Sequence, residues 1–198
     1  MTSPLPKLSV VVTSTREGRV GLAIGKWFEA QAKKHGGFEV ELIDLVEMGL
    51  PLLDERNHPN QRNYEKDHTK AWSARVAARD AFVFVVPEYN FGMPPALLNA
   101  LDYLYHEWHY KPAAFTSYGG QSGGLRSVQM AKPVLTTLRM MPIPEGVTVQ
   151  FFSKHMQDDG SFEPGDAFDK PTQAMLDELA RWTEALQTLR SKVTLSRR

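Results

Sequence analysis

Residues 14–21 combine side-chain types that suit a phosphate ligand. Two hydroxyls, two arginines and two glycines stand there, directly before an expected helix. Because the first backbone N–H groups of a helix lack partners and the helix dipole favours negative charge, we expect an anion as the ligand. Neither the Gly-Lys-Ser/Thr of a P-loop nor the pattern G-x-G-x-x-G is present, which favours a monophosphate over a pyrophosphate. Judged alone, the segment also fits an ordinary polar turn whose Ser or Thr caps the helix.

Two later segments have the composition of loops that cover a flat ring. In residues 87–95, two prolines bracket a rigid turn, Gly92 is expected to relax the backbone, and Tyr89 and Phe91 are placed to cover a ring. In residues 117–126, four glycines leave backbone amides exposed, which suits a negatively charged edge. Each segment alone also fits a structural turn, but together they indicate a planar, anionic heterocycle.

Short apolar runs alternate with amphipathic segments along the chain, and these are the elements that must position the loops. Strands are predicted at residues 8–13, 38–45, 81–86, 113–118 and 147–152. Helices are predicted from the first loop to Gly36, at 64–79, 95–104 and 124–140, and in a final helix that contains Met175 and Leu189. Residues 51–63 are expected to form a long loop.

Strands that alternate with helices of this length predict a parallel α/β sheet covered on both faces, because each parallel connection needs a crossover. In such sheets ligands bind beyond the carboxyl ends of the strands, where the strand order reverses. The loops after the first, third and fourth strands, which are the three segments above, are therefore expected to converge.

Composition narrows the classes of function. The chain has 198 residues, 42% of them hydrophobic and 23% charged, so we expect one domain over residues 1–198. Its 23 basic and 23 acidic residues balance, which disfavours nucleic acid and membrane surfaces as partners. Cysteine is absent and no apolar stretch could cross a bilayer, so we expect a cytoplasmic protein whose redox chemistry would need a cofactor.

The histidines and one aromatic cluster allow other interpretations. No metal site is expected, because the six histidines lack a recognisable ligand spacing: His35, His58, His68, His106, His109 and His155. An aromatic cluster follows the second of the three loops and could be core or an interface between subunits: Tyr103, Tyr105, Trp108 and Tyr110.

The three loops resemble those of the NAD(P)H-dependent FMN reductases, which include quinone, azo and chromate reductases. The resemblance covers nearly the whole chain and rests on four motifs in the same order. These are Ser-Thr-Arg-x-Gly-Arg at 14–19, Pro-Glu-Tyr-Asn at 87–90, Leu-Asn-Ala-Leu-Asp at 98–102, and Tyr-Gly-Gly at 118–120 followed by Ser-Gly-Gly-Leu-Arg at 122–126. It implies a three-layer flavodoxin-like fold, with a five-stranded parallel sheet of order 2-1-3-4-5 and helices on both faces.

The resemblance also implies a site for FMN. The phosphate would be held by Ser14, Arg16, Arg19, Val20 and Gly21. The flavin ring would be lined by Pro87, Glu88, Tyr89, Asn90 and Phe91, and its pyrimidine side would meet Ser117, Tyr118, Gly119 and Gly120. The chain departs from many members at Val20 and Gly21, where they carry a small polar residue and then Asn, so backbone donors would have to replace those side chains.

By the same resemblance, hydride would pass from NADPH or NADH through FMN to a small electrophile. The acceptor would be a quinone, an azo compound, a metal oxyanion or free flavin, with ping-pong kinetics. No catalytic residue is assigned, because the flavin carries the chemistry and the protein supplies position and electrostatics. Related reductases pair through the aromatic region, so a homodimer, or a tetramer, is expected.

Two other functions stay open at this point. Residues 120–124 match the nucleophile elbow G-x-S-x-G, so Ser122 could serve a serine esterase; the only later histidine is His155 and the only carboxylate between them is Glu145. Alternatively, the protein could hold FMN as an electron carrier without turning over nicotinamide. The neutral charge disfavours that role, because single-electron carriers are usually acidic.

Overall fold

The computed structural model describes residues 4–195 and has the α/β architecture expected from the sequence. One parallel sheet has the strand order β2-β1-β3-β4-β5, as predicted. The strands are β1 (Lys7–Val12), β2 (Glu39–Asp44), β3 (Ala81–Pro87), β4 (Pro112–Tyr118) and β5 (Met141–Val149). The helices are α1 (Gly21–His35), α2 (Leu45–Met48), α3 (Asp67–Ala77), α4 (Pro95–Asp102), α5 (Leu125–Thr137) and α6 (Asp169–Leu195), with short 3-10 turns at Pro59–Gln61, His106–Trp108 and Phe152–His155.

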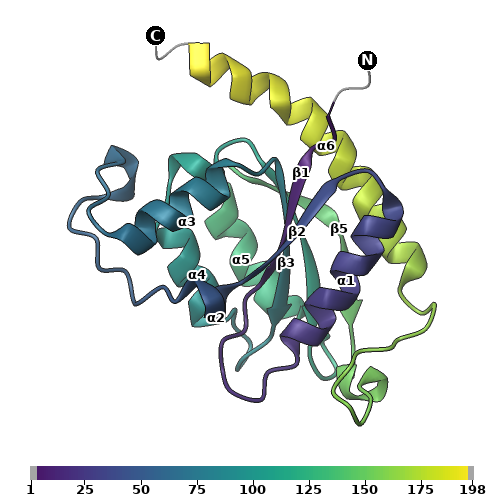
Figure 1. Ribbon diagram of the computed structural model, residues 1–198. Helices are drawn as coiled ribbons and strands as arrows, with labels where there is room; N and C mark the ends of the chain where they lie inside the picture. The colour runs from purple at the N-terminus through teal and green to yellow at the C-terminus, as the bar shows by residue number, and fades with distance from the viewer. Residues whose placement is uncertain (1–3, 196–198) are drawn as a thin grey trace.

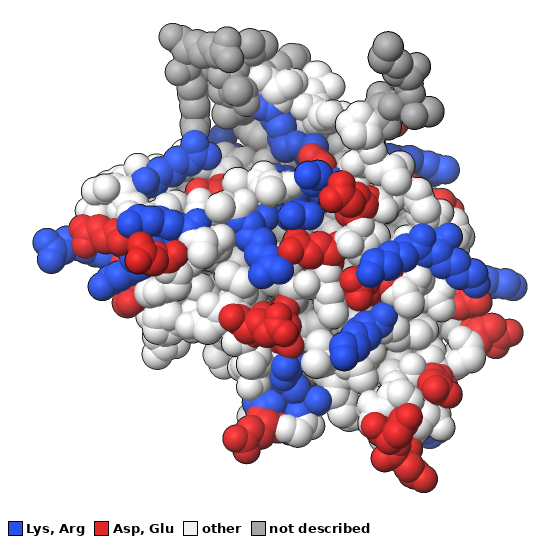
Figure 2. All heavy atoms as spheres, in the orientation of Figure 1, with Lys and Arg blue, Asp and Glu red and all other residues white. Residues whose placement is uncertain are grey.

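Helices cover both faces of the sheet. Helices α1 and α6 lie on one face, and α3, α4 and α5 lie on the other (Figure 1). The central strands β3 and β4 are buried at every residue, which explains why their sequences are continuously apolar. None of the helices within residues 4–195 is long and apolar enough to cross a membrane. Acidic and basic side chains are intermixed on the face shown in Figure 2.

The last strand is the main error in the sequence-based prediction. We expected a strand at 147–152, but β5 begins six residues earlier, at Met141, and ends at Val149. The strand contains Pro142 and Pro144, which an edge strand tolerates because one side of its ladder needs no donors, and β5 lies at the edge of the sheet beside β4. Phe151, with φ 47°, turns the chain away from the sheet.

Several helix boundaries also differ from the prediction, and α4 ends at Asp102 rather than at residue 104. Helix α3 starts at Asp67 rather than at residue 64, because the Glu55 carboxylate accepts the N–H groups of Glu65 (3.0 Å) and Lys66 (3.0 Å) and holds them outside the helix. Helix α5 ends at Thr137 rather than at residue 140, and Arg139 then adopts a left-handed φ of 56°.

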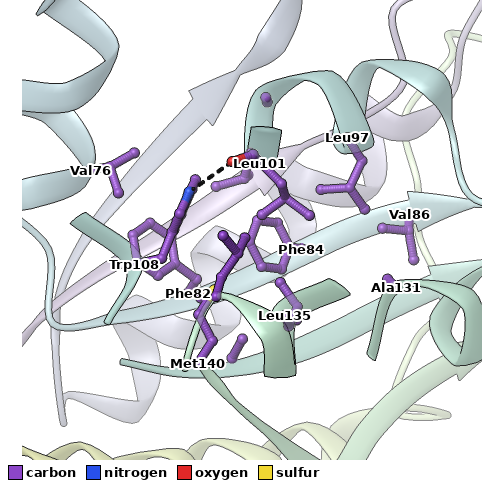
Figure 3. Packing of buried hydrophobic residues seen from close by; sticks show 14 of the residues in the cluster. Val76, Phe82, Phe84, Val86, Leu97, Leu101, Trp108, Ala131, Leu135 and Met140 are labelled. Atoms are coloured by element: carbon purple, nitrogen blue, oxygen red, sulfur yellow. Dashed lines mark hydrogen bonds between the residues drawn. The ribbon is translucent and has the colours of Figure 1, made fainter. Parts of the chain in front are cut away.

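The aromatic residues after α4 belong mainly to the core on the α3–α5 face. Tyr103 and Trp108 are fully buried, and the Trp108 indole donates to the Leu101 carbonyl at 3.2 Å (Figure 3). The Trp108 and Phe82 ring centroids lie 5.1 Å apart. Tyr103 and Trp108 therefore belong to the core of the chain, and not to an interface between subunits.

Candidate functional site

The carboxyl ends of three strands bring the predicted loops together. Val12 at the end of β1 pairs with Val85 of β3, and Pro87 at the end of β3 pairs with Tyr118 at the end of β4. The loops that follow these strands, at residues 13–20, 88–94 and 119–124, therefore start side by side at one edge of the sheet. We call this edge the carboxyl rim.

The first loop closes tightly against the start of α1. Ser14 is fully buried, and within residues 4–195 its Oγ has no hydrogen-bond partner of standard geometry. A Cβ at Gly21 would overlap Ser14 Oγ and lie 2.6 Å from the Tyr118 hydroxyl oxygen, so only glycine fits there. Helix α1 has no side-chain cap, which leaves its first N–H groups to another acceptor. The unusual Val20–Gly21 pair is thus compatible with an anion site built from the backbone.

Arg19 is oriented by an acid that sequence reasoning did not identify. Its Nη2 lies 2.7 Å from Asp44 Oδ2 at the end of β2, and the two side chains are only 15% and 5% exposed. Asp44 also accepts the Val46 N–H at 3.1 Å and so caps α2. The other terminal nitrogen, Arg19 Nη1, is buried without a partner in the described part of the chain. Arg16 differs, because it is exposed and donates a hydrogen bond to the adjacent Glu17 carbonyl at 3.1 Å.

The second loop is a tight hairpin turn with unusual backbone angles. The N–H of Tyr89 donates to the Gly92 carbonyl (3.0 Å) and the N–H of Gly92 donates back (2.9 Å). The two central residues, Asn90 (φ 49°) and Phe91 (φ 69°), are left-handed, as in a type I′ turn. The expectation that Gly92 relaxes the backbone was wrong: Gly92 has an ordinary φ, and the strain falls on Asn90 and Phe91.

Glu88 connects the second and third loops. Its carboxylate accepts hydrogen bonds from Ser122 Oγ (2.9 Å) and the Arg126 N–H (3.0 Å) and pairs with Arg126 Nη1 (2.9 Å). Burial alone would raise its pKa, but the hydrogen bonds from Arg126 and Ser122 outweigh burial and hold the pKa of Glu88 below its ordinary value. The side chain predicted to line a ring therefore fixes two loops relative to each other.

The third loop offers fewer free backbone N–H groups than its four glycines suggested. The Gly119 N–H already donates to the Val149 carbonyl at 3.2 Å, so it is not an exposed donor as expected. Gly124 (φ 85°) caps α5, and a Cβ there would lie 2.9 Å from Ser117 Cβ. No atom lies within 4 Å of a Cβ built on Gly120, so this residue borders open space.

The Tyr118 side chain points toward the first loop and not toward the third loop, which follows it in the chain. Its hydroxyl lies beside Ser14 and Gly21, and burial raises its pKa to about 12, although the nearby Ser14 hydroxyl opposes that rise. The phenol therefore stays protonated at neutral pH and can donate a hydrogen bond. Sequence reasoning had assigned Tyr118 to the pyrimidine side of the ring.

A cavity of about 450 Å³ adjoins the rim. It is bordered by Thr15 of the first loop, Val46 of α2, exposed Leu52, and Ala96 and Asn99 of α4. A larger cavity of about 560 Å³ lies elsewhere, next to Lys111 at the amino-terminal end of β4. Within residues 4–195 no group of three or more His, Cys, Asp or Glu side chains could hold a metal ion.

The sheet order and the rim define a flavodoxin-like α/β protein in which α1 begins at the rim without a side-chain cap. The comparisons with known proteins agree: the family model described as NADPH-dependent FMN reductase matches residues 6–154, so the chain belongs to that family. A NAD(P)H-dependent FMN reductase of Schizosaccharomyces pombe is 41% identical over 141 residues, which cover 70% of each chain. A NADPH azoreductase of a Bacillus species is 35% identical over 123 residues, covering 61% of this chain and 66% of its own.

A solved structure shares the fold. The flavoenzyme NAD(P)H:(acceptor) oxidoreductase FerB of Paracoccus denitrificans superposes with a TM-score of 0.72 at 23% identity, covering 91% of this chain and 98% of its own. At this identity the likeness supports the architecture and not the identity of individual site residues.

Proposed function

We propose that this protein is an NAD(P)H-dependent reductase that holds FMN at the carboxyl rim and reduces a small electrophile. The observation that carries the proposal is a pair of buried polar atoms at the first loop that have no hydrogen-bond partner of standard geometry within residues 4–195. They are Arg19 Nη1 and Ser14 Oγ, which lies beside the Tyr118 hydroxyl, and they stand next to an uncapped helix start. Buried polar groups without partners are rare in native proteins, so each needs an explanation, and a phosphate would satisfy both. When bound, FMN supplies the hydride chemistry.

The proposed ligand set follows the three loops. Ser14, Arg16, Arg19, Val20 and Gly21 would hold the phosphate, with the buried Arg19 contributing more than the exposed Arg16. The turn of Pro87, Glu88, Tyr89, Asn90 and Phe91 would border the ring, and Ser117, Tyr118, Gly119 and Gly120 would form the remaining edge. Of the last four, the Tyr118 hydroxyl faces the phosphate loop and the Gly119 N–H is already used, which leaves Gly120 as the open backbone donor.

The chain's own task at this rim is positioning. Glu88 fixes the second loop to the third, and Asp44 fixes the Arg19 guanidinium in the first, so the site is organised before a ligand arrives. A shared pocket for donor and acceptor would give ping-pong kinetics, with a quinone, an azo compound, a metal oxyanion or free flavin as acceptor. Relatives named quinone oxidoreductase and azoreductase support the first two classes.

The experiment is a flavin titration followed by anaerobic addition of NADPH. We expect the protein to quench FMN fluorescence on binding, and NADPH or NADH to bleach the visible absorbance of the bound flavin. Initial-rate lines at several acceptor concentrations should run parallel. A protein without affinity for FMN would refute the proposal, a yellow protein not bleached by either nucleotide would support the carrier alternative, and intersecting lines would refute the shared pocket.

The geometry does not favour the esterase alternative. The Ser122 hydroxyl donates to Glu88, whereas the His155 ring contacts Phe162 and Phe168, with centroids 5.9 and 5.4 Å away. A nucleophilic serine needs a histidine within hydrogen-bond reach, and these two residues have different partners.

We also propose that the protein forms a homodimer or tetramer and works in the cytoplasm. Support for assembly comes from the aliphatic residues exposed beside the 450 Å³ cavity: Leu52 is 82% exposed, Leu53 43% and Val46 44%. Sedimentation velocity would test the assembly, with a dimer expected for the parent chain and a larger monomer fraction for Leu52→Ser. A strictly monomeric parent chain would refute it.

A further inference from the structure

Phe91 adopts a conformation that its residue type disfavours. It is the second central residue of the type I′ turn, a position that prefers glycine, and Asn-Gly is among the best sequences for this turn. Phe91 nevertheless has a left-handed φ of 69°, and 70% of its surface is exposed. Backbone strain of this kind gathers at functional sites, where the side chain has a use that the fold does not explain.

A cation covers one face of the Phe91 ring. The Arg126 guanidinium lies 4.1 Å from the ring centroid, within the range of a cation–π interaction. The same guanidinium is held at 2.9 Å by Glu88, whose side chain is only 8% exposed. Arg126 itself is 51% exposed, so the pair presents an open aromatic surface beside N–H donors that solvent can reach.

This combination fits one end of the pyridine nucleotide donor. If the proposed function holds, the nicotinamide ring must lie on the flavin for hydride transfer, and the adenosine end must then bind at the margin of the flavin site, of which Phe91 would form part. Adenine stacks on aromatic rings, and a guanidinium pairs well with a phosphate. We propose that Phe91 and Arg126 bind the adenosine 2′-phosphate end of NADPH, and that Arg126 makes the protein prefer NADPH to NADH.

A second aromatic–cation pair provides a matched control. Phe151 is also left-handed (φ 47°) and 45% exposed, and Lys154 Nζ lies 4.9 Å from its ring centroid. It follows the edge strand β5, however, and not the central strand β3 that carries the second loop. Its N–H donates to the Gly120 carbonyl of the third loop at 3.0 Å, a backbone contact that Phe151→Gly retains. Lysine also lacks the planar fork that pairs with two phosphate oxygens.

The test uses adenosine 2′,5′-bisphosphate and adenosine 5′-monophosphate as probes, titrated calorimetrically into the FMN-loaded protein. Arg126→Gln should weaken binding of the bisphosphate about tenfold and leave the monophosphate within about twofold, because only the 2′-phosphate contact is lost. Arg126→Lys should give an intermediate loss. Phe91→Gly should weaken both probes, because the stacking surface is lost. Phe151→Gly should change neither.

Steady-state kinetics give an independent readout. In Arg126→Gln the KM for NADPH should rise about tenfold while the KM for NADH stays within about twofold. Bisphosphate binding unaffected by Arg126→Gln, or weakened as much by Phe151→Gly as by Phe91→Gly, would overturn the assignment. FMN affinity is measured separately, and the probes can also be titrated into flavin-free protein, so a failure of the flavin proposal is distinguishable from a failure of this one.

Discussion

The carboxyl rim and the cavity at the amino-terminal end of β4 both contain buried polar groups, but the two regions differ in whether these groups have hydrogen-bond partners. The amino-terminal cavity is the larger, about 560 Å³, yet its buried acid Glu107 accepts hydrogen bonds from Tyr64 (3.2 Å) and Ser73 (2.8 Å). Its buried amine, Lys111, donates to the Val76 and Ala77 carbonyls. At the rim, Ser14 Oγ and Arg19 Nη1 have no partner among the described residues.

This difference indicates a structural role for the polar groups of the amino-terminal cavity and a ligand-binding role for those of the rim. The polar groups of the amino-terminal cavity connect elements of the fold: Lys111 joins β4 to the end of α3, and Arg190 joins α6 to Asp80 (3.1 Å) and the Tyr110 carbonyl (2.9 Å). At the rim, Ser14 Oγ and Arg19 Nη1 instead stay without a partner of standard geometry within residues 4–195. Left-handed non-glycine residues occur in both regions, Arg62 and Tyr110 at the amino-terminal cavity and Asn90 and Phe91 at the rim. Hydrogen bonding, and not backbone strain or cavity volume, therefore distinguishes the two regions.

Glu107→Ala should have the largest effect on the fold. Removing this buried carboxylate takes the acceptor from the Ser73 hydroxyl and leaves the Tyr64 hydroxyl only its long bond to the Pro59 carbonyl (3.5 Å) among the described residues. This should lower the free energy of unfolding by about 3 kcal/mol, or the Tm by about 6–12 °C. Urea unfolding would measure it, with exposed Glu184→Ala as the control. FMN affinity should be unchanged in the folded protein, and a large loss of affinity would place Glu107 in the functional site after all.

Arg19→Met should have the largest effect on ligand binding. The change removes a buried charged donor from the first loop, so we expect FMN to bind about 10–100 times more weakly, corresponding to about 1.5–3 kcal/mol. Exposed Arg16→Met should cost no more than about threefold, because solvent screens a surface charge. Fluorescence titration would compare the two variants. Equal losses would mean that burial of Arg19 does not set its contribution.

The pH dependence of stability tests the amino-terminal cavity. Burial, reinforced by the nearby Arg190 charge, lowers the pKa of Lys111 from 10.5 to about 7. Between these values the unfolded chain holds a proton that the folded chain has lost, so stability should rise with pH, by at most about 1.4 kcal/mol per pH unit. Tyr64, Tyr103 and Tyr118 have raised pKa values and would lower stability only above about pH 10.

Urea unfolding between about pH 7.5 and 9.5 isolates the lysine from the tyrosines. The rise in stability over that window should disappear in Lys111→Met, which keeps most of the side-chain volume and removes the titrating amine. An unchanged slope in the variant would show that other groups cause the pH dependence.

Much of the geometry of the carboxyl rim was predictable because its determinants are local. The apolar runs of β1, β3 and β4 predicted the strands, and the loops after them carry their own motifs. What local sequence could not show were partners supplied from a distance: Asp44 for Arg19, and Glu88 for Arg126 and Ser122. Asp44 ends a strand that looked merely amphipathic, and no spacing links it to a residue 25 positions earlier.

The sequence by itself determined the alternation of strands and helices, because hydrophobic periodicity and glycine positions act over a few residues. It also indicated which three loops would converge at the carboxyl rim. Tertiary structure decided which groups in those loops have hydrogen-bond partners. The Gly119 N–H donates to the Val149 carbonyl of β5, the left-handed backbone falls on Asn90 and Phe91, and Arg19 Nη1 has no partner among the described residues. Hydrogen-bond satisfaction depends on neighbours in space, and these are fixed only when the strands pair.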